Sequence, residues 1–237
     1  MNNQPADVTT SQQLETSGDG RSARWDAHRA SRRLELIKLA RRAIHELGPN
    51  ASMEDIAAQA NTSKSVFYRY FGDKDGLRHA VGEYVIKKFR SGVIAAGRKS
   101  RDNGDALHAM MLAYLQMAAN SPNIYFFVTA GPATDVLTDP AGAGGKVRDG
   151  ALNDFFEELT SMMRERMHSY MGIAPGELAS PALELWPRAS IGMVRAAGEL
   201  WLRAPDTSQR PSIEELAQSI TGWLTHGVAH QASAESR

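Results

Sequence analysis

A run of cationic and hydroxyl-bearing side chains between residues 63 and 70 has the chemistry that proteins use to contact DNA. The run consists of Ser63, Lys64, Ser65, Tyr68, Arg69 and Tyr70. Ammonium and guanidinium groups donate hydrogen bonds to phosphate oxygens or to guanine O6 and N7, and hydroxyl groups donate mainly to phosphates and sugars. In a helix, Val66 and Phe67 face inward and leave these polar groups on the other side. A short helix with such a face suits the major groove of DNA.

The stretch that must position this run is residues 51–71, which we interpret as two short helices joined by a tight turn. Ser52 and Asp55 have the spacing of an N-terminal capping box. The first helix has an apolar face formed by Met53, Ile56, Ala57 and Ala60. Asn61 is suited to the left-handed backbone conformation of the turn. A helical hairpin on the surface of any all-α protein would show the same spacing, so spacing alone leaves both interpretations open.

The charge distribution favours a polyanionic partner for this half of the chain. The whole chain has zero net charge, with 27 Lys and Arg and 27 Asp and Glu. Residues 21–99 hold 17 Lys and Arg against 8 Asp and Glu, a net charge of +9, and the remaining residues carry −9. One module that faces nucleic acid and one neutral or acidic module would produce this split. A solvated basic surface without a partner is the alternative.

Composition excludes several classes of function. The 237 residues contain no cysteine, which excludes disulfides, thiolate catalysis and cysteine metal sites. No apolar run approaches the roughly 20 residues of a membrane span, and the polar first 20 residues lack the apolar segment of a signal peptide. We therefore expect a cytoplasmic protein without membrane contact. Residues 1–22 are rich in Asn, Gln, Ser, Thr and Gly, so we expect a disordered polar tail there.

Apolar residues recur at helical spacing through most of the chain, and no segment shows sustained alternation of apolar and polar residues. We therefore predict an all-α fold. Glycine and proline separate the segments, notably across residues 131–150, where we expect a loop or a broken helix. The predicted helices outside the helix pair cover residues 26–47, 74–98, 106–120, 122–130, 151–171, 182–203 and 212–230.

The N-terminal part resembles the TetR family of bacterial transcription regulators. The resemblance runs from about residue 32 to residue 85 and is densest in SKSVFYRYFGDKDGL, residues 63–77. IAAQA at residues 56–60 is similar to the usual IA..AG run, whereas Asn61 and Thr62 stand where the family commonly has Gly and Val. The resemblance implies a three-helix DNA-binding head, residues 23–75, and a larger ligand-binding and dimerisation body, residues 76–237.

The family further implies a homodimeric repressor that a small effector releases from a palindromic operator in double-stranded DNA. By residue match, the expected DNA contacts are Ser52, Ser63, Lys64, Ser65, Tyr68, Arg69, Tyr70 and Lys74. Lys74 matches a phosphate-contacting lysine, and its place in the first turn of a helix is unfavourable for a cation unless a phosphate lies beside it. The acidic pair Glu54 and Asp55 argues against base contacts from the preceding helix.

The second half carries no motif of comparable strength. Its large apolar residues predict either a ligand pocket or plain core packing, and the candidates are Met110, Met111, Tyr114, Phe126, Phe127, Phe155, Met163, Met167, Trp186 and Met193. The C-terminal pattern of tryptophan-bearing helices is similar to that of actinobacterial family members that control lipid metabolism. We therefore expect a hydrophobic effector, such as an acyl-chain molecule. The last two helices are apolar on more than one side, which predicts a homodimer interface or, alternatively, closure of the monomer core. Arg188 and Arg195 could bind an anionic group of an effector, but we expect them to pair with Glu184 and Glu199 at four-residue spacing.

Enzyme signatures are weak. The glycine-rich segment AGAGGKVRDG is not a phosphate-binding loop, because Pro140 replaces its first glycine and Val147 follows Lys146. His226 and His230 are four residues apart, but no glutamate follows the first as in zinc proteases. We expect no enzymatic activity, no cofactor and no metal. The competing hypothesis is a helical enzyme or ligand carrier with an incidental DNA-binding head.

Overall fold

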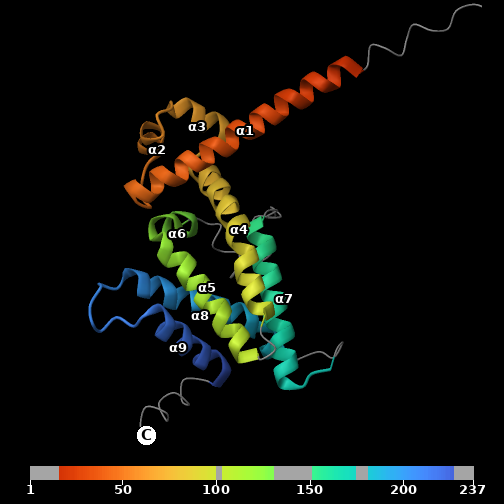
Figure 1. Ribbon diagram of the computed structural model, residues 1–237, viewed down its shortest axis with the longest axis vertical. Coiled ribbons are helices and arrows are strands. Elements are labelled where there is room, and N and C mark those ends of the chain that lie inside the picture. The colour runs from red at the N-terminus through yellow and green to blue at the C-terminus, as the bar shows by residue number, and fades with distance from the viewer. Residues whose placement is uncertain (1–15, 100–102, 131–150, 175–180, 227–237) are drawn as a thin grey trace, which may run out of the picture.

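A computed structural model describes residues 16–99, 103–130, 151–174 and 181–226 (Figure 1). In these ranges all regular secondary structure is helical, as predicted. The helices are α1 (Thr16–Leu47), α2 (Met53–Gln59), α3 (Lys64–Phe71), α4 (Lys74–Lys99), α5 (Asn103–Asn120), α6 (Pro122–Thr129), α7 (Ala151–Met171), α8 (Pro181–Arg203) and α9 (Ile213–His226). None of these helices has the length and apolarity required to cross a membrane. The predicted loop at residues 131–150 lies outside the described residues.

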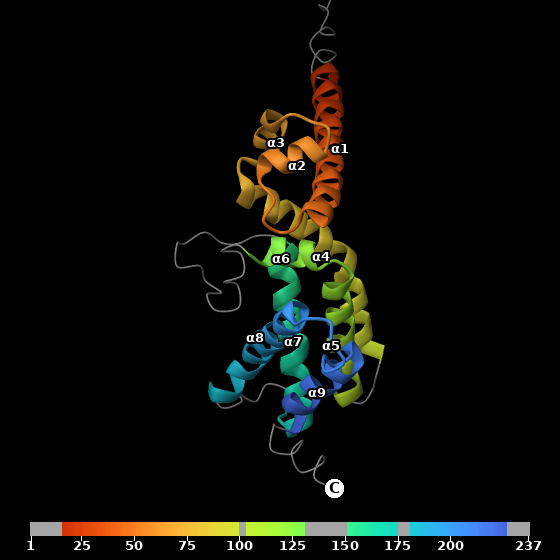
Figure 2. The same cartoon turned by 90° about the vertical axis from the view of Figure 1, so that its left-hand side faces the viewer.

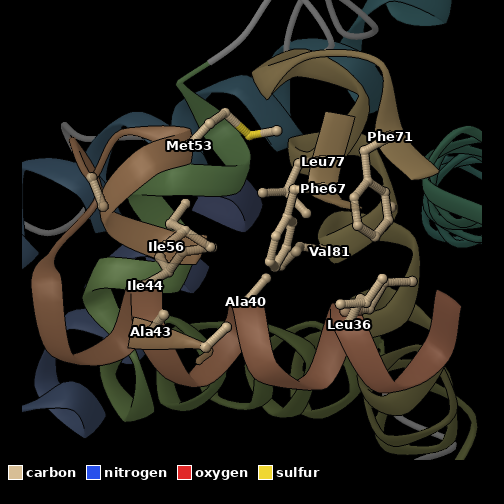
Figure 3. Close-up of a cluster of buried hydrophobic side chains, with 14 of the residues drawn as sticks. Leu36, Ala40, Ala43, Ile44, Met53, Ile56, Phe67, Phe71, Leu77 and Val81 are labelled. Carbon is tan, nitrogen blue, oxygen red and sulfur yellow. The ribbon is translucent and has the colours of Figure 1, made fainter. Parts of the chain in front are cut away.

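The head packs α2, α3 and the first turns of α4 against the C-terminal half of α1 (Figure 3). Each helix contributes the apolar residues that its spacing predicted. The fully buried side chains include Leu36, Ala40, Ile44, Ile56, Phe67, Leu77 and Val81. Because Leu77, Ala80 and Val81 lie in this core, the head extends past residue 75, where we placed its boundary.

Three backbone features set the angles between the head helices. Asn61 has a φ of +49°, so the turn between α2 and α3 uses the left-handed conformation predicted for it. Gly48, with a φ of +95°, ends α1. A Cβ atom at Gly76 would lie 1.9 Å from the carbonyl oxygen of Phe71, so only glycine allows α4 to start this close to the end of α3.

The N-terminal end of α1 differs from the prediction. The helix begins at Thr16, although we expected a disordered tail to residue 22 and a helix only from residue 26. Residues 22–31 are all exposed, and the Trp25 side chain has 72% of its surface accessible. This part projects beyond the head (Figure 1). Extending an existing helix costs far less free energy than nucleating one, so α1 continues through residues 22–31 although their side chains are exposed.

The body lies below the head and is built around α4, which runs from one into the other (Figure 2). Its core gathers residues from α4, α5, α7, α8 and α9, including Ile86, Met110, Leu115, Leu159 and Ile220. The short helix α6 lies directly beneath the head, and its Ile124 and Phe127 belong to the head core. Both α4 and α6 therefore link the two parts. Phe89 of α4 is 37% exposed.

Candidate DNA interface and ligand cavity

The outer face of α3 presents most of the predicted DNA contacts to solvent. Ser63, Lys64, Ser65, Tyr68 and Arg69 are exposed, and Phe67 and Phe71 anchor the other side of the helix in the head core. Tyr70 differs, since it is half-buried and packs against that core. The guanidinium of Arg69 lies 5.4 Å from the centroid of the Tyr70 ring. Of the predicted set, five side chains are thus free to enter a groove together.

Lys64 has an acidic neighbour on α2. Its ammonium group forms an ion pair with Glu54, and it lies 5.5 Å from the centroid of the Tyr68 ring. Both members of the ion pair are about half exposed, and such pairs contribute little stability in water. A phosphate or a guanine can therefore replace Glu54 at small cost. The sequence indicated an acidic edge at residues 54 and 55, but not that Glu54 would contact Lys64.

Ser52 and Asp55 form the predicted capping box at the start of α2. The backbone N–H of Asp55 donates to Ser52 Oγ at 3.1 Å, and the N–H of Ser52 donates to Asp55 Oδ2 at 3.1 Å. The Ser52 hydroxyl also donates to Asp55 Oδ2 at 2.6 Å. These hydrogen bonds from Ser52, with a smaller contribution from nearby Lys74, lower the pKa of Asp55. The Ser52 side chain therefore has a structural role before any contact with DNA.

Lys74 is the first residue of α4 and lies at the junction of head and body. Its Nζ donates to the backbone oxygen of Asn50 at 3.2 Å and lies 5.9 Å from the centroid of the Phe127 ring. Asp73 Oδ1 accepts from the N–H of Gly76 at 2.7 Å and caps the helix. Lys74 thus belongs to the first turn of α4, the helix end whose free N–H groups could hold the same phosphate.

A cavity of about 310 Å³ lies in the body between α4, α5, α6, α7 and α8. Five of the ten predicted ligand residues line it, namely Met110, Met111, Tyr114, Phe155 and Met163. Sequence reasoning missed Phe89, Tyr125 and Phe156. It also missed the aliphatic lining from α4, α7 and α8, which includes Val85, Ile86, Val93, Leu159, Ile191 and Val194. Aliphatic residues at helical spacing have the same pattern whether they face a neighbour or a cavity, so no sequence signal distinguishes them.

The other five candidates lie elsewhere. Met167 and Trp186 line a second hollow of about 1040 Å³ between α5, α7, α8 and α9. Phe127 is fully buried in the head core, and Phe126 packs under Arg203, whose guanidinium lies 4.6 Å from its ring centroid. Met193 is exposed on α8, on the side away from Ile191 and Val194. We correct these three: Phe126, Phe127 and Met193 line neither cavity, because each lies on a helix face that points to the head core, to Arg203 or to solvent.

A polar network borders the cavity near α6. The hydroxyl groups of Tyr114 and Tyr125 are 2.7 Å apart, and Tyr125 donates to Glu199 at 3.3 Å. Arg195 Nε donates to Glu199 at 2.9 Å, which confirms the predicted pairing at four-residue spacing. Burial raises the pKa of Tyr125 to about 12 and that of Tyr114 well above its usual value. The two tyrosines are therefore neutral hydrogen-bonding groups at any physiological pH.

The second predicted pairing on α8 is wrong. Arg188, expected to pair with Glu184, donates to Glu157 of α7 at 2.7 Å. Glu184 instead accepts from Arg164 at 2.8 Å and lies 3.1 Å from His168 Nε2, and these partners lower its pKa. Because α7 packs against α8, Arg188 and Glu184 each pair with residues of α7 and not with each other.

Comparison with known proteins covers both parts of the chain. Residues 36–81 match the family described as bacterial regulatory proteins, tetR family, and residues 93–236 match the tetracyclin repressor-like C-terminal domain. An uncharacterized HTH-type transcriptional regulator of Mycobacterium tuberculosis is 30% identical over 204 residues, which are 86% of this chain and 80% of that protein.

Solved structures share the fold at low identity. The fatty acid degradation regulator FadR from Bacillus halodurans superposes with a TM-score of 0.58 at 15% identity, covering 83% of this chain and 95% of that one. The regulator FadR from Bacillus subtilis, solved in complex with stearoyl-CoA, has a TM-score of 0.56 at 15% identity, covering 82% of this chain and 98% of that one.

Proposed function

The chain belongs to the TetR family of DNA-binding transcriptional regulators, and we propose that it is a homodimeric repressor released from a palindromic operator by a small hydrophobic effector. The observation that carries this proposal is the apolar cavity beneath the head, bordered by α4 and α6, which also pack into the head core. A molecule in this cavity acts on the two helices that hold the head. The protein acts in the cytoplasm by binding operator DNA and an effector, and it catalyses no reaction.

On the DNA side, α3 enters the major groove and the exposed set Ser63, Lys64, Ser65, Tyr68 and Arg69 makes the contacts. Lys74 and the N-terminus of α2, with Ser52, contact the sugar-phosphate backbone at the edge of the groove. Exposure of the first set and the position of Lys74 at the start of α4 support these roles. Tyr70 contributes through its hydroxyl group only, since its ring packs against the head core.

We predict that Lys64→Ala combined with Tyr68→Ala weakens operator binding strongly. Each lost contact costs about 1 to 3 kcal/mol in each half-site. Removing Lys64 also leaves Glu54 unneutralised beside the DNA. The measurement is fluorescence anisotropy on a DNA fragment that the wild-type protein selects from a random pool, at several salt concentrations. The salt dependence of the binding constant should also decrease, because fewer counterions are released.

The matched control is Lys38→Ala, which removes an exposed cation from α1 without touching α3. It should leave affinity close to that of the wild type. Circular dichroism melting must show that the double variant is folded. A folded double variant with wild-type affinity would contradict the proposed contacts.

On the effector side, the shape and chemistry of the cavity support an acyl chain. Its lining residues on α4 extend from Gly82 to Val93, which corresponds to a length of roughly 16 Å along the helix axis. Methionine, phenylalanine and aliphatic side chains from five helices form most of its wall. Such a lining offers apolar contact along a chain and few hydrogen bonds. The stearoyl-CoA complex of a protein with this fold shows that the architecture can hold an acyl ligand in that protein.

We predict that acyl-chain ligands raise the melting temperature and release the protein from its selected DNA, with potency that rises and then falls along a series of chain lengths. Ligand binding to the folded state alone produces the stabilisation. Differential scanning fluorimetry and anisotropy measure the two effects. Leu159→Trp, which fills the cavity, should abolish both responses and leave DNA binding intact. A response only to polar or cationic compounds would contradict an acyl effector.

For the homodimer, α8 offers an exposed apolar stripe. Leu185, Ala189, Met193, Ala196 and Leu200 are all exposed, at spacings that place them on one face. Leu185 and Leu200 have 68% and 70% of their side chains accessible. On α9, Glu214 and Gln218 are exposed, so α8 supplies most of the apolar surface. Two copies of α8, related by a two-fold axis, form the core of the proposed interface.

A further inference from the structure

The exposed lining residues mark where the cavity reaches the surface. They are Arg41 of α1, Lys88 and Phe89 of α4, and Asn120 at the end of α5. Two of these four are cations, and within the described part of the chain no acidic side chain forms an ion pair with either. Lys88 Nζ lies 5.2 Å from the centroid of the Tyr84 ring, a contact that leaves its N–H donors available. An apolar cavity with an unneutralised cationic mouth fits a ligand with a long apolar part and an anionic end.

The polar network of Tyr114, Tyr125, Glu199 and Arg195 that borders the cavity is not suited to bind the anionic end of the ligand. Glu199 can only accept, so Tyr125 donates to Glu199 and Tyr114 donates to Tyr125. Both hydroxyl protons are used, and the oxygen of Tyr114 offers only lone pairs. Arg195, the third cation of the lining, is paired with Glu199. An anionic group placed there would meet an acceptor and a neutralised cation, whereas at the mouth it meets Arg41 and Lys88.

We propose that the effector enters the cavity with its acyl chain first and that its phosphate-bearing headgroup stays at the mouth, bound by Arg41 and Lys88. This inference rests on the proposed function and specifies the ligand and its orientation. Arginine and lysine both donate charge-assisted hydrogen bonds to phosphate oxygens. Coenzyme A thioesters and lysophospholipids share this combination of chain and headgroup.

The position of Arg41 gives the headgroup a direct route to the DNA-binding head. Arg41 lies on α1, one turn before His45, which contacts the start of α6. His45 Nδ1 is 2.9 Å from Ser121 Oγ, and Asn123 Nδ2 donates to the backbone oxygen of His45 at 2.8 Å. Lys88 lies on α4 in the body. A headgroup bound to both cations therefore favours one spacing between α1 and α4, and a ligand shifts a conformational equilibrium through such state-dependent contacts.

The test compares charged and uncharged ligands of one chain length on matched variants. Isothermal titration calorimetry would measure binding of lauroyl-CoA, lauroyl lysophosphatidate and dodecanol to the wild type, Arg41→Gln, Lys88→Gln and Arg42→Gln. Arg42 is an exposed cation on the same helix that does not line the cavity. We expect Arg41→Gln and Lys88→Gln each to weaken phosphate-ligand binding by about tenfold, the size of one charge-assisted hydrogen bond. Dodecanol binding should not change, and Arg42→Gln should match the wild type.

The outcomes separate this inference from the proposed function. If the wild type binds all three ligands equally, or if Arg41→Gln and Lys88→Gln bind lauroyl-CoA as the wild type does, the headgroup site is wrong and the acyl cavity stands. If Arg42→Gln weakens binding as much as Arg41→Gln, the phosphate is attracted by the basic surface of α1 in general, and the specific headgroup site is wrong. If the wild type binds none of them, the acyl effector is wrong and this inference falls with it. Selective loss for one phosphate ligand supports the site and identifies the headgroup.

Discussion

Replacing Phe127 with alanine is expected to lower the free energy of unfolding by about 3 to 5 kcal/mol, the range for a fully buried phenylalanine. Phe127 belongs to α6 but lies in the core of the head with no accessible surface. Arg78 lies 5.5 Å from the centroid of its ring, and Arg78 Nε donates to the Phe127 carbonyl oxygen at 2.9 Å. The substitution leaves a void at the junction of head and body, so it should destabilise both the head and its attachment.

Urea denaturation followed by circular dichroism measures the loss, and the matched control is the adjacent residue. Phe126→Ala removes the same side chain from a half-buried site under Arg203 and should cost clearly less. Neither variant should change the chain-length preference for the effector, because neither ring lines the cavity. Equal losses for the two variants would mean that Phe127 is not a core residue of the junction.

The head was predictable because its sequence constrains it at several levels. The capping box of Ser52 and Asp55, the left-handed Asn61 and the inward Phe67 each predicted one local feature, and all agree with one three-helix arrangement. Because α2 and α3 are short, each has few alternative faces that could pack against the core. Partners from outside this stretch were not predictable, such as Glu54 for Lys64 or the α6 residues that complete the core. They depend on how distant segments pack.

The body was predictable as a set of helices, but not as a cavity. Its helices are apolar on several faces, so periodicity could not assign Phe126, Phe127 and Met193 to a core, a surface or a pocket. Arg188 illustrates the same limit, since a partner on α7 replaces the one at four-residue spacing. The mouth of the cavity brings together Arg41, Lys88 and Asn120, which lie far apart in the sequence and therefore share no local sequence pattern.

The second large effect is expected at the exposed stripe of α8, where Leu185→Glu combined with Leu200→Glu should convert a dimer into a monomer. In a two-fold interface each substitution occurs twice, so four carboxylates would be desolvated in an apolar contact, an unfavourable change without paired cations. Light scattering with size exclusion measures the result directly. The wild type should have about twice the 25.9 kDa mass of the chain, and the variant should have the mass of one chain.

The same double substitution should also lower operator affinity, because a monomer presents only one head to a site with two half-sites. Loss of the second, linked contact should weaken binding by roughly a hundredfold or more. Met171→Glu is the matched control, since Met171 is an exposed apolar residue at 53% accessibility at the end of α7 and does not belong to the α8 stripe. It should stay dimeric and keep its affinity. A monomeric wild type would contradict the proposed dimer, and a double variant that stays dimeric would place the interface on another surface. If the monomeric variant bound a palindromic site as tightly as the wild type, two heads would not be needed for recognition.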